Sequence, residues 1–409
     1  MTSFIINGNR ALSGEIKISG SKNAALPIIF ATIVTGGVSC VSGVADIGDV
    51  RVALEILSEL GAVVSRLGED LIIDTRNLRY KRPSDALVTK IRASSYLLGA
   101  NLSRFGRCEM QSFGGCNFDF RPLDMHVGAM RSLGAESSGN EFYAKELFGA
   151  DIVFKTASVG ATVNAILLSV RAKGRTRIYG YAKEPHVISL VEFLKSAGAN
   201  ISLFDDRIEV FGAELSGAKA TVIFDMIEAG TYLALSLLTD SKLKITGIDP
   251  SHLTSFFEFL ASGGAILECT ENSATVSGEF DECASVITGA YPAYPTDLQP
   301  QSAPLLARFC GGKITETVWK SRFGYLSELE KFGIKHRRCA SSATIYKSEI
   351  KAACAKVPDL RGGAALLMCA LSAKGESVIE SAEIIKRGYS DIVNKLRQIG
   401  ADIFESEDT

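Results

Sequence analysis

The chain has 409 residues, of which 46% are hydrophobic and 22% charged, and its formal net charge is −2. This length is enough for two or three domains with cores of their own, and the composition is that of an ordinary globular protein. Because no basic excess exists to neutralise phosphate groups, the charge argues against a nucleic-acid or membrane-surface partner.

Cysteine usage argues against a zinc site or a disulfide framework. The nine cysteines are scattered without a Cys-x-x-Cys pair, and only four histidines accompany them. This pattern fits a reducing compartment. The first ten residues, MTSFIINGNR, lack the charged-then-apolar pattern of a signal peptide. We therefore expect a cytoplasmic protein.

Residues 23–45 carry no charge and are long enough for a membrane span. Pro27, Gly36, Gly37 and Gly43 interrupt the stretch, and a strand-like VSCVSGV lies at its end. We therefore predict a buried helix, a turn and a strand here.

Internal repetition is the strongest pattern in the chain. An apolar helix that ends in a glycine turn occurs six times, at 53–64, 125–137, 190–201, 256–267, 326–336 and 392–403. The turn glycines are Gly61, Gly134, Gly198, Gly264, Gly333 and Gly400. They lie 64–73 residues apart, which is too long for a solenoid repeat.

Each repeat also contains an earlier helix rich in small apolar residues, such as KNAALPIIFATIV, and short strands with period-two alternation, such as RIEVFG. The composition of the earlier helix predicts burial on most sides. Each repeat is therefore an α/β module, and core size favours two lobes of three modules over one closed body. A ligand is expected in a cleft between such lobes.

Polar residues recur at the start of the buried helix and in the loop after the strand. The first set is Lys22, Asn23, Arg92, Ser158, Asp225, Glu228, Thr296, Asp297, Asp359 and Arg361, and the second is Cys116, Arg121, Glu184, Arg322 and Arg387. Helix N-termini attract anions, and added cations would hold a ligand with several negative charges. The alternative is that these residues are helix caps and surface charges.

Cys116 follows Gly114 and Gly115 and precedes Arg121 by five residues. The glycines permit backbone angles closed to other residues, so we expect the cysteine on a turn of a lid-like loop. A thiol near a guanidinium loses its proton more easily, which suits proton transfer or nucleophilic attack. The alternative is an ordinary buried cysteine.

Six segments in order, SGSKNAALP (19–27), GGCNFDFRPLD (114–124), SVGAT (158–162), YPTDLQ (294–299), DLRGG (359–363) and KRGY (386–389), resemble the UDP-N-acetylglucosamine enolpyruvyl transferases. These enzymes, the UDP-N-acetylglucosamine 1-carboxyvinyltransferases, belong to the EPSP synthase family. The resemblance implies a two-domain inside-out α/β barrel of six βαβαββ-like units, three per domain. It places residues 1–21 with 226–409 in one domain, and residues 22–225, with the Cys116 loop, in the other.

The resemblance also implies transfer of the enolpyruvyl group of phosphoenolpyruvate to the sugar 3-hydroxyl, without a metal or cofactor. Lys22, Arg121 and Arg387 would bind the phosphate of phosphoenolpyruvate, and Arg322 and Arg361 its carboxylate. Cys116 would be the acid and Asp297 the base, so Cys116, Asp297, Lys22 and Arg387 are the implied catalytic residues. The sugar nucleotide would contact Asn23, Arg92, Pro122, Leu123, Asp124, Ser158, Val159, Gly160 and Val318.

Some positions depart from the family pattern, namely Phe113, Asp119, Phe120, His186, Met226 and Tyr325. Two alternatives follow: a paralogous enolpyruvyl transferase with another nucleotide acceptor, or a non-catalytic regulator that binds sugar nucleotide. A relative acting on shikimate 3-phosphate is disfavoured because SGSKNAALP is the sugar-nucleotide version of its motif.

Overall fold

A computed structural model describes residues 2–109, 111–114, 122–282 and 284–407 of the chain. Its described residues form two compact units, each treated by itself below. The terminal unit comprises residues 2–19 and 224–407, and the middle unit comprises residues 20–114 and 122–223. Among the residues that the structure describes, no helix has the length and apolar character needed to cross a bilayer.

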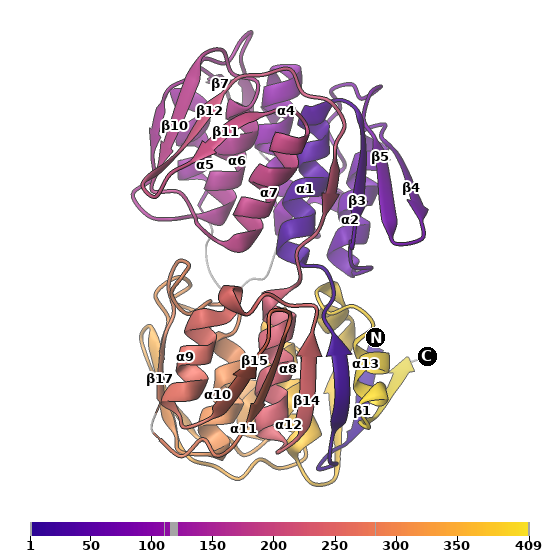
Figure 1. Ribbon diagram of the computed structural model, residues 1–409, viewed down its shortest axis with the longest axis vertical. Coiled ribbons are helices and arrows are strands. Elements are labelled where there is room, and N and C mark those ends of the chain that lie inside the picture. Colours follow the sequence, from indigo (N-terminus) through magenta and orange to yellow (C-terminus); the bar gives the residue numbers. More distant parts are fainter. Residues whose placement is uncertain (1, 110, 115–121, 283, 408–409) are drawn as a thin grey trace. The chain divides into compact units, whose positions relative to one another are not determined.

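The middle unit packs the apolar helices α1, α4 and α6 against one another at its centre, with strands outside them (Figure 1). Its helices are α1 (Lys22–Thr35), α2 (Gly48–Glu59), α3 (Asp85–Val88), η1 (Arg92–Tyr96), α4 (Leu97–Phe105), α5 (Asp124–Ser132), α6 (Val159–Ser169) and α7 (Pro185–Ser196). Its strands are β3 (Val38–Ser42), β4 (Val63–Leu67), β5 (Asp70–Asp74), β6 (Arg107–Glu109), β7 (Glu136–Ser138), β8 (Glu141–Tyr143), β9 (Asp151–Val153), β10 (Arg175–Tyr179), β11 (Asn200–Leu203), β12 (Arg207–Phe211) and β13 (Lys219–Thr221).

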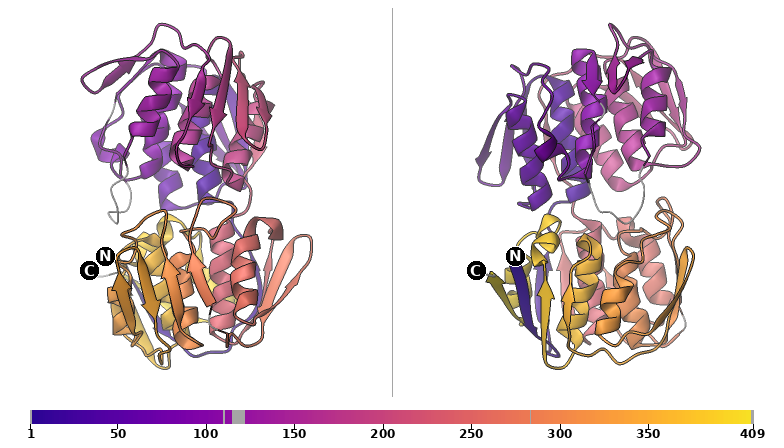
Figure 2. Two further views of the ribbon diagram at one scale, coloured as in Figure 1. Left: turned by 90° about the vertical axis from the view of Figure 1, so that its left-hand side faces the viewer. Right: turned by 180° about the vertical axis from the view of Figure 1, so that it is seen from behind.

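The terminal unit repeats this plan around α8, α10 and α12, and Figure 2 shows the central helices of each unit from two further sides. Its helices are α8 (Met226–Leu238), η2 (Pro250–Leu253), α9 (Thr254–Ser262), α10 (Gln299–Arg308), α11 (Leu326–Lys331), α12 (Leu360–Ser372), η3 (Ala382–Arg387) and α13 (Ile392–Gln398). Its strands are β1 (Thr2–Asn7), β2 (Ser13–Lys17), β14 (Lys242–Thr246), β15 (Ile266–Cys269), β16 (Ser273–Ser277), β17 (Ala284–Ile287), β18 (Gly312–Thr315), β19 (His336–Cys339), β20 (Ser342–Ile345), β21 (Cys354–Lys356), β22 (Glu376–Glu380) and β23 (Asp402–Glu407).

The predicted repeat is confirmed in its local geometry. All six turn glycines have left-handed φ angles, between 85° and 102°. A side chain is strained at such angles, so glycine at these turns lets each outer helix reverse into a strand. The prediction for the uncharged stretch 23–45 is also confirmed, because α1 is buried on nearly every side and is followed by a turn and β3.

In each unit, one strand pairs with a strand that is distant in sequence. In the terminal unit β2 runs parallel to β14, and in the middle unit β13 runs parallel to β3. Strands β2 and β13 therefore join sheets whose other strands are distant in sequence. Within the described residues, five sheets have four strands and the sheet β6-β8-β7 has three.

Candidate active site

In the terminal unit, carboxylates gather where the central helices begin. The Asp225 side chain caps α8 by accepting hydrogen bonds from the backbone N–H groups of Ile227 and Glu228. The Asp359 side chain caps α12 in the same way, from Arg361 and Gly362. Both satisfy helix N–H groups that have no partner within the helix. Asp297 instead lies in the turn that precedes α10.

Asp297 is held between two buried guanidinium groups. Arg322 Nη1 donates to Asp297 Oδ1 at 2.7 Å, and Arg361 Nε and Nη2 both donate to Asp297 Oδ2 at 3.1 Å. The arginine side chains are 4% and 2% exposed, whereas that of Asp297 is 29% exposed. Burial opposes the charged form of Arg361, but Asp297 and other nearby groups outweigh it and raise the pKa of Arg361 further above its ordinary value. The arrangement is a paired cationic fork that already holds one carboxylate.

The other predicted residues of this unit lie around the fork. Arg387 ends η3, two residues before Tyr389, whose ring centre is 5.5 Å from the guanidinium carbon of Arg361. Val318 follows β18; the residue is 39% exposed, and its N–H donates to Glu316. The structure thus brings Asp297, Arg322 and Arg361 into direct contact, and it places Val318 in the loop after β18 and Arg387 at the end of η3.

In the middle unit, Lys22 opens α1 and its ammonium group lies 2.9 Å from Asp49 Oδ2 in the first turn of α2. The Lys22 side chain is 14% exposed and that of Asp49 is 6% exposed. Such a pair fixes the direction of a flexible lysine chain at a helix N-terminus, where an anion is favoured. Asn23 is the next residue of α1 and is half-buried.

The remaining predicted residues of this unit lie on elements around His126. Arg92 opens η1, Asp124 opens α5, and Ser158 caps α6 just before Val159 and Gly160. Pro122 and Leu123 precede α5. A Cβ atom built on Gly160 would lie 3.3 Å from His126 Nε2, so the imidazole ring lies against the start of α6.

His126 is a buried neutral imidazole with an assigned tautomer. Asn164 Oδ1 accepts from the N–H of Gly99 at 2.6 Å, so Asn164 Nδ2 is the amide atom that faces His126 Nδ1, at 2.8 Å. Because Nδ2 donates, Nδ1 accepts and the proton is on Nε2, beside Gly160. Burial, helped by Arg92 and opposed by Asp124, lowers the pKa of His126 to about 4. The ring therefore offers a neutral N–H donor at the first turn of α6.

We expect acidification to destabilise the protein through this ring. Because the folded-state pKa of about 4 is below the ordinary value of 6.5, the unfolded state binds more protons between these values, and stability falls as the pH drops from 6.5 to 4. The expected loss between pH 7 and pH 4.5 is on the order of 2 kcal/mol. Denaturant unfolding of the wild type and His126→Gln at both pH values measures it. An equal pH dependence in the two proteins would contradict the assignment.

Cys116 and Arg121 lie outside the described residues, but the segment just before them is anchored to the middle unit. Gly114 donates its N–H to the carbonyl of Val88 at 3.1 Å, and Gln111 Nε2 donates to the carbonyl of Pro83 at 3.2 Å. We predicted that Gly114 supplies a backbone angle closed to other residues. This prediction was wrong, because the φ angle of Gly114 is not left-handed. A Cβ atom there would instead lie 1.9 Å from the carbonyl oxygen of Thr89, so close backbone approach requires glycine.

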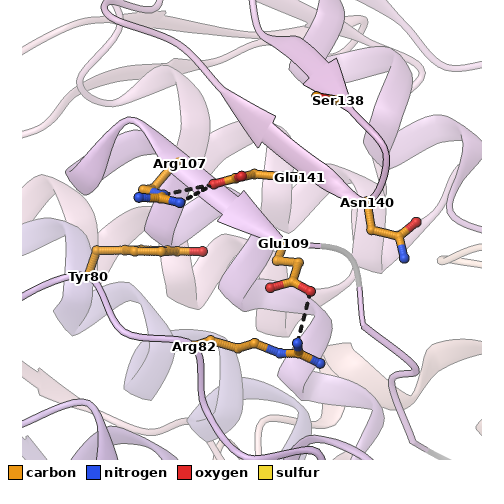
Figure 3. Close-up of a pocket in the computed structure, with 7 residues that line it drawn as sticks. All are labelled: Tyr80, Arg82, Arg107, Glu109, Ser138, Asn140 and Glu141. Carbon is orange, nitrogen blue, oxygen red and sulfur yellow. Dashed lines mark hydrogen bonds and ion pairs between the residues drawn. The ribbon is translucent and has the colours of Figure 1, made fainter.

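A separate open pocket of about 400 Å³ lies beside the three-stranded sheet (Figure 3). Its charged groups are paired: Arg82 with Glu109 at 3.1 Å, and Arg107 with Glu141 at 2.8 Å, with Arg107 also over the ring of Tyr80. None of the described residues that line it was predicted to bind substrate. The pocket lies between β6 and the segment that contains Tyr80 and Arg82, which is not a strand of the sheet β6-β8-β7.

The model of the family described as EPSP synthase (3-phosphoshikimate 1-carboxyvinyltransferase) matches residues 6–396. The chain belongs to the EPSP synthase family. Two solved structures show the same fold. The enolpyruvyl transferase NikO from Streptomyces tendae has a TM-score of 0.90 at 24% identity, covering 100% of this chain and 99% of that one. An EPSP synthase from Acinetobacter baumannii has a TM-score of 0.73 at 17% identity, covering both chains fully. The predicted two-domain α/β fold is confirmed.

Curated members of the EPSP synthase family are similar over nearly the whole chain. A relative from Caldanaerobacter subterraneus subsp. tengcongensis, named UDP-N-acetylglucosamine 1-carboxyvinyltransferase 3, is 37% identical over 98% of this chain and 99% of its own. A relative from Listeria monocytogenes, named UDP-N-acetylglucosamine 1-carboxyvinyltransferase 2, is 38% identical over 98% of this chain and 97% of its own. The family prediction made from the six segments is confirmed.

The sequence analysis did not identify four buried residues that contact the predicted site residues, namely Asp49, His126, Asn164 and Glu316. Each bonds to a residue more than 25 positions away, so local spacing carries no sign of the pairing. His126 was closest to detection, because it follows the GGCNFDFRPLD segment by two residues.

Proposed function

We propose that this chain transfers the enolpyruvyl group of phosphoenolpyruvate to the 3-hydroxyl of UDP-N-acetylglucosamine and releases phosphate. This is the committed step of peptidoglycan precursor synthesis. The full-length likeness to relatives named for this transfer supports the reaction. The observation that carries it is the Asp297 carboxylate between Arg322 and Arg361, because the same contacts suit the carboxylate of phosphoenolpyruvate.

The fork formed by Arg322 and Arg361 explains how Asp297 can be paired in the free protein and still act as a base during the reaction. A carboxylate that accepts from two guanidinium groups is a weak base. When the carboxylate of phosphoenolpyruvate takes its place on Arg322 and Arg361, Asp297 is released and accepts the proton of the sugar hydroxyl. The base would thus become available only when the donor substrate is bound.

The remaining groups would handle the phosphate and the methylene carbon. Lys22, Arg121 and Arg387 would bind the phosphate, and Cys116 would protonate the methylene carbon as the sugar oxygen bonds to the neighbouring carbon. The resulting tetrahedral ketal loses phosphate and one methyl proton to give the enolpyruvyl ether. Fixed donors around such a charged intermediate are the main source of rate enhancement in sites of this kind.

The middle unit would bind the sugar nucleotide. The first turn of α6, from Ser158 to Gly160, presents backbone N–H groups suited to a diphosphate. Asn23, Arg92, Pro122, Leu123 and Asp124 would surround the rest of the nucleotide, and Val318 is the other residue that we propose contacts it. We place the reaction in the cytoplasm, because the nine cysteines are scattered without a Cys-x-x-Cys pair, as is usual in a reducing compartment.

The test is phosphate release from phosphoenolpyruvate with UDP-N-acetylglucosamine, UMP or shikimate 3-phosphate as acceptor. Release with UDP-N-acetylglucosamine alone is expected, and Cys116→Ser should abolish or severely slow it. Fosfomycin, an epoxide, should alkylate Cys116 and leave the serine variant unlabelled. Release with UMP would indicate a paralogous transferase. Ligand-induced stabilisation without release from any acceptor would indicate a regulator and overturn the proposal.

A further inference from the structure

Glu316 is a buried carboxylate that lies behind the fork in the terminal unit. It directly follows β18 and is 1% exposed. Its Oε1 accepts from the hydroxyl of Thr288 at 2.7 Å and from the N–H groups of Val318 and Trp319, both at 2.9 Å. Its Oε2 accepts from the hydroxyl of Thr296 at 2.9 Å. Burying a carboxylate is costly unless donors surround it, and here they come from three separate segments.

The bond to Glu316 fixes the direction of the Thr296 hydroxyl. An ionised carboxylate can only accept, so the hydroxyl proton of Thr296 points to Glu316. A lone pair of the same oxygen then faces Arg322, whose Nη1 donates to it at 3.0 Å. Arg322 Nη1 donates its other proton to Asp297. The two protons of Nη1 are therefore divided between Thr296, which Glu316 orients, and Asp297.

This division matters when a substrate carboxylate displaces Asp297. The bond from Arg322 to Asp297 is then lost, whereas the bond to Thr296 remains. We propose that Glu316 and Thr296 are positioning residues that hold the Arg322 guanidinium in place while the carboxylate of phosphoenolpyruvate replaces that of Asp297. The inference rests on the proposed function and adds to it the residues that keep the fork rigid during the exchange.

Two threonines on the same carboxylate provide a matched test. Thr288 and Thr296 each donate a hydroxyl hydrogen bond to Glu316. Among the described contacts, Arg322 donates to Thr296 and not to Thr288. Valine has nearly the shape of threonine without the hydroxyl, so Thr296→Val and Thr288→Val remove one donor each. Thr296→Ser keeps the hydroxyl and serves as the rescue variant. Thermal unfolding of all three monitors the fold.

Phosphoenolpyruvate affinity is measured by calorimetry without acceptor, and KM and kcat in the phosphate-release assay. Thr296→Val is expected to weaken phosphoenolpyruvate binding and raise its KM on the order of tenfold, with a smaller effect on the KM of the acceptor. Thr288→Val should change both KM values less than threefold, and Thr296→Ser should restore binding. A Glu316→Gln variant should follow Thr296→Val, because its amide cannot accept from every donor.

The outcomes separate the two proposals. Equal effects of Thr296→Val and Thr288→Val on phosphoenolpyruvate binding, or no effect of Thr296→Val, would overturn the positioning role even if the wild type turns over UDP-N-acetylglucosamine. A wild type that binds phosphoenolpyruvate but transfers nothing would overturn the proposed function, while the binding series still decides the role of Thr296. A wild type that does not bind phosphoenolpyruvate would overturn both.

Discussion

Asp297→Asn is expected to slow turnover by a factor on the order of 10²–10⁴, the usual contribution of a general base, while tightening the binding of phosphoenolpyruvate about tenfold. The two effects have one cause. The asparagine amide cannot take up the proton of the sugar hydroxyl, and it no longer competes as an anion for Arg322 and Arg361. Stopped-flow or steady-state phosphate release measures the first effect, and calorimetry the second.

The same change should destabilise the ligand-free protein by on the order of 2–3 kcal/mol, because it leaves two buried guanidinium groups without their anion. Phosphoenolpyruvate should restore more of the melting temperature in this variant than in the wild type, since it supplies the missing carboxylate. Asp240→Asn is the control. Asp240 pairs with Arg308 but its side chain is 65% exposed, so its loss should change stability by less than about 1 kcal/mol. Weakened phosphoenolpyruvate binding in Asp297→Asn would contradict the exchange of carboxylates on the fork.

Gly114→Ala is expected to lower turnover by on the order of a hundredfold and to slow labelling of Cys116 by fosfomycin. The added Cβ would lie 1.9 Å from the carbonyl oxygen and 2.4 Å from the carbonyl carbon of Thr89, so the backbone must move by about an ångström or more. Cys116 is two residues further along, and a displacement of that size at a reacting group can cost about 10²-fold in rate.

The matched control for this prediction is Gly128→Ala. Gly128 lies in α5, and a Cβ atom there would have no neighbour within 4 Å. Alanine at such a helical position should stabilise the fold by about 0.5–1 kcal/mol and leave turnover unchanged. If Gly114→Ala labels and turns over as fast as Gly128→Ala, the close approach to Thr89 has no bearing on the thiol.

The repeat and its helices could be predicted from the sequence because both signals are local. A run of small apolar residues predicts a buried helix wherever it occurs, and a glycine after an amphipathic helix predicts a left-handed turn. This is why Gly61, Gly264 and Gly400 were identified, although their neighbours along the chain differ. The repeat does not predict that β2 pairs with β14 or that β13 pairs with β3, since short strands carry little information about their pairing partner.

The residues of the candidate site also fall into two groups: those that stand in a recognisable sequence segment, and those that only contacts between distant segments reveal. Asp297 and Arg361 were named because they stand in recognisable segments. Glu316 stands at an ordinary strand end, and its partners Thr288 and Thr296 are 28 and 20 residues away. Gly114 was singled out for the wrong property, because close approach to a carbonyl from another segment cannot be distinguished from turn geometry in a sequence.

The pairing of strands that are distant in sequence has a consequence for biosynthesis. The middle unit lacks only β13 once residue 211 has been made, so it can close while the ribosome is still synthesising the rest of the chain. The terminal unit must wait, because β1 near the start of the chain pairs with β23 near its end. During translation β1 must therefore stay without this partner until β23 has been synthesised and has left the ribosome.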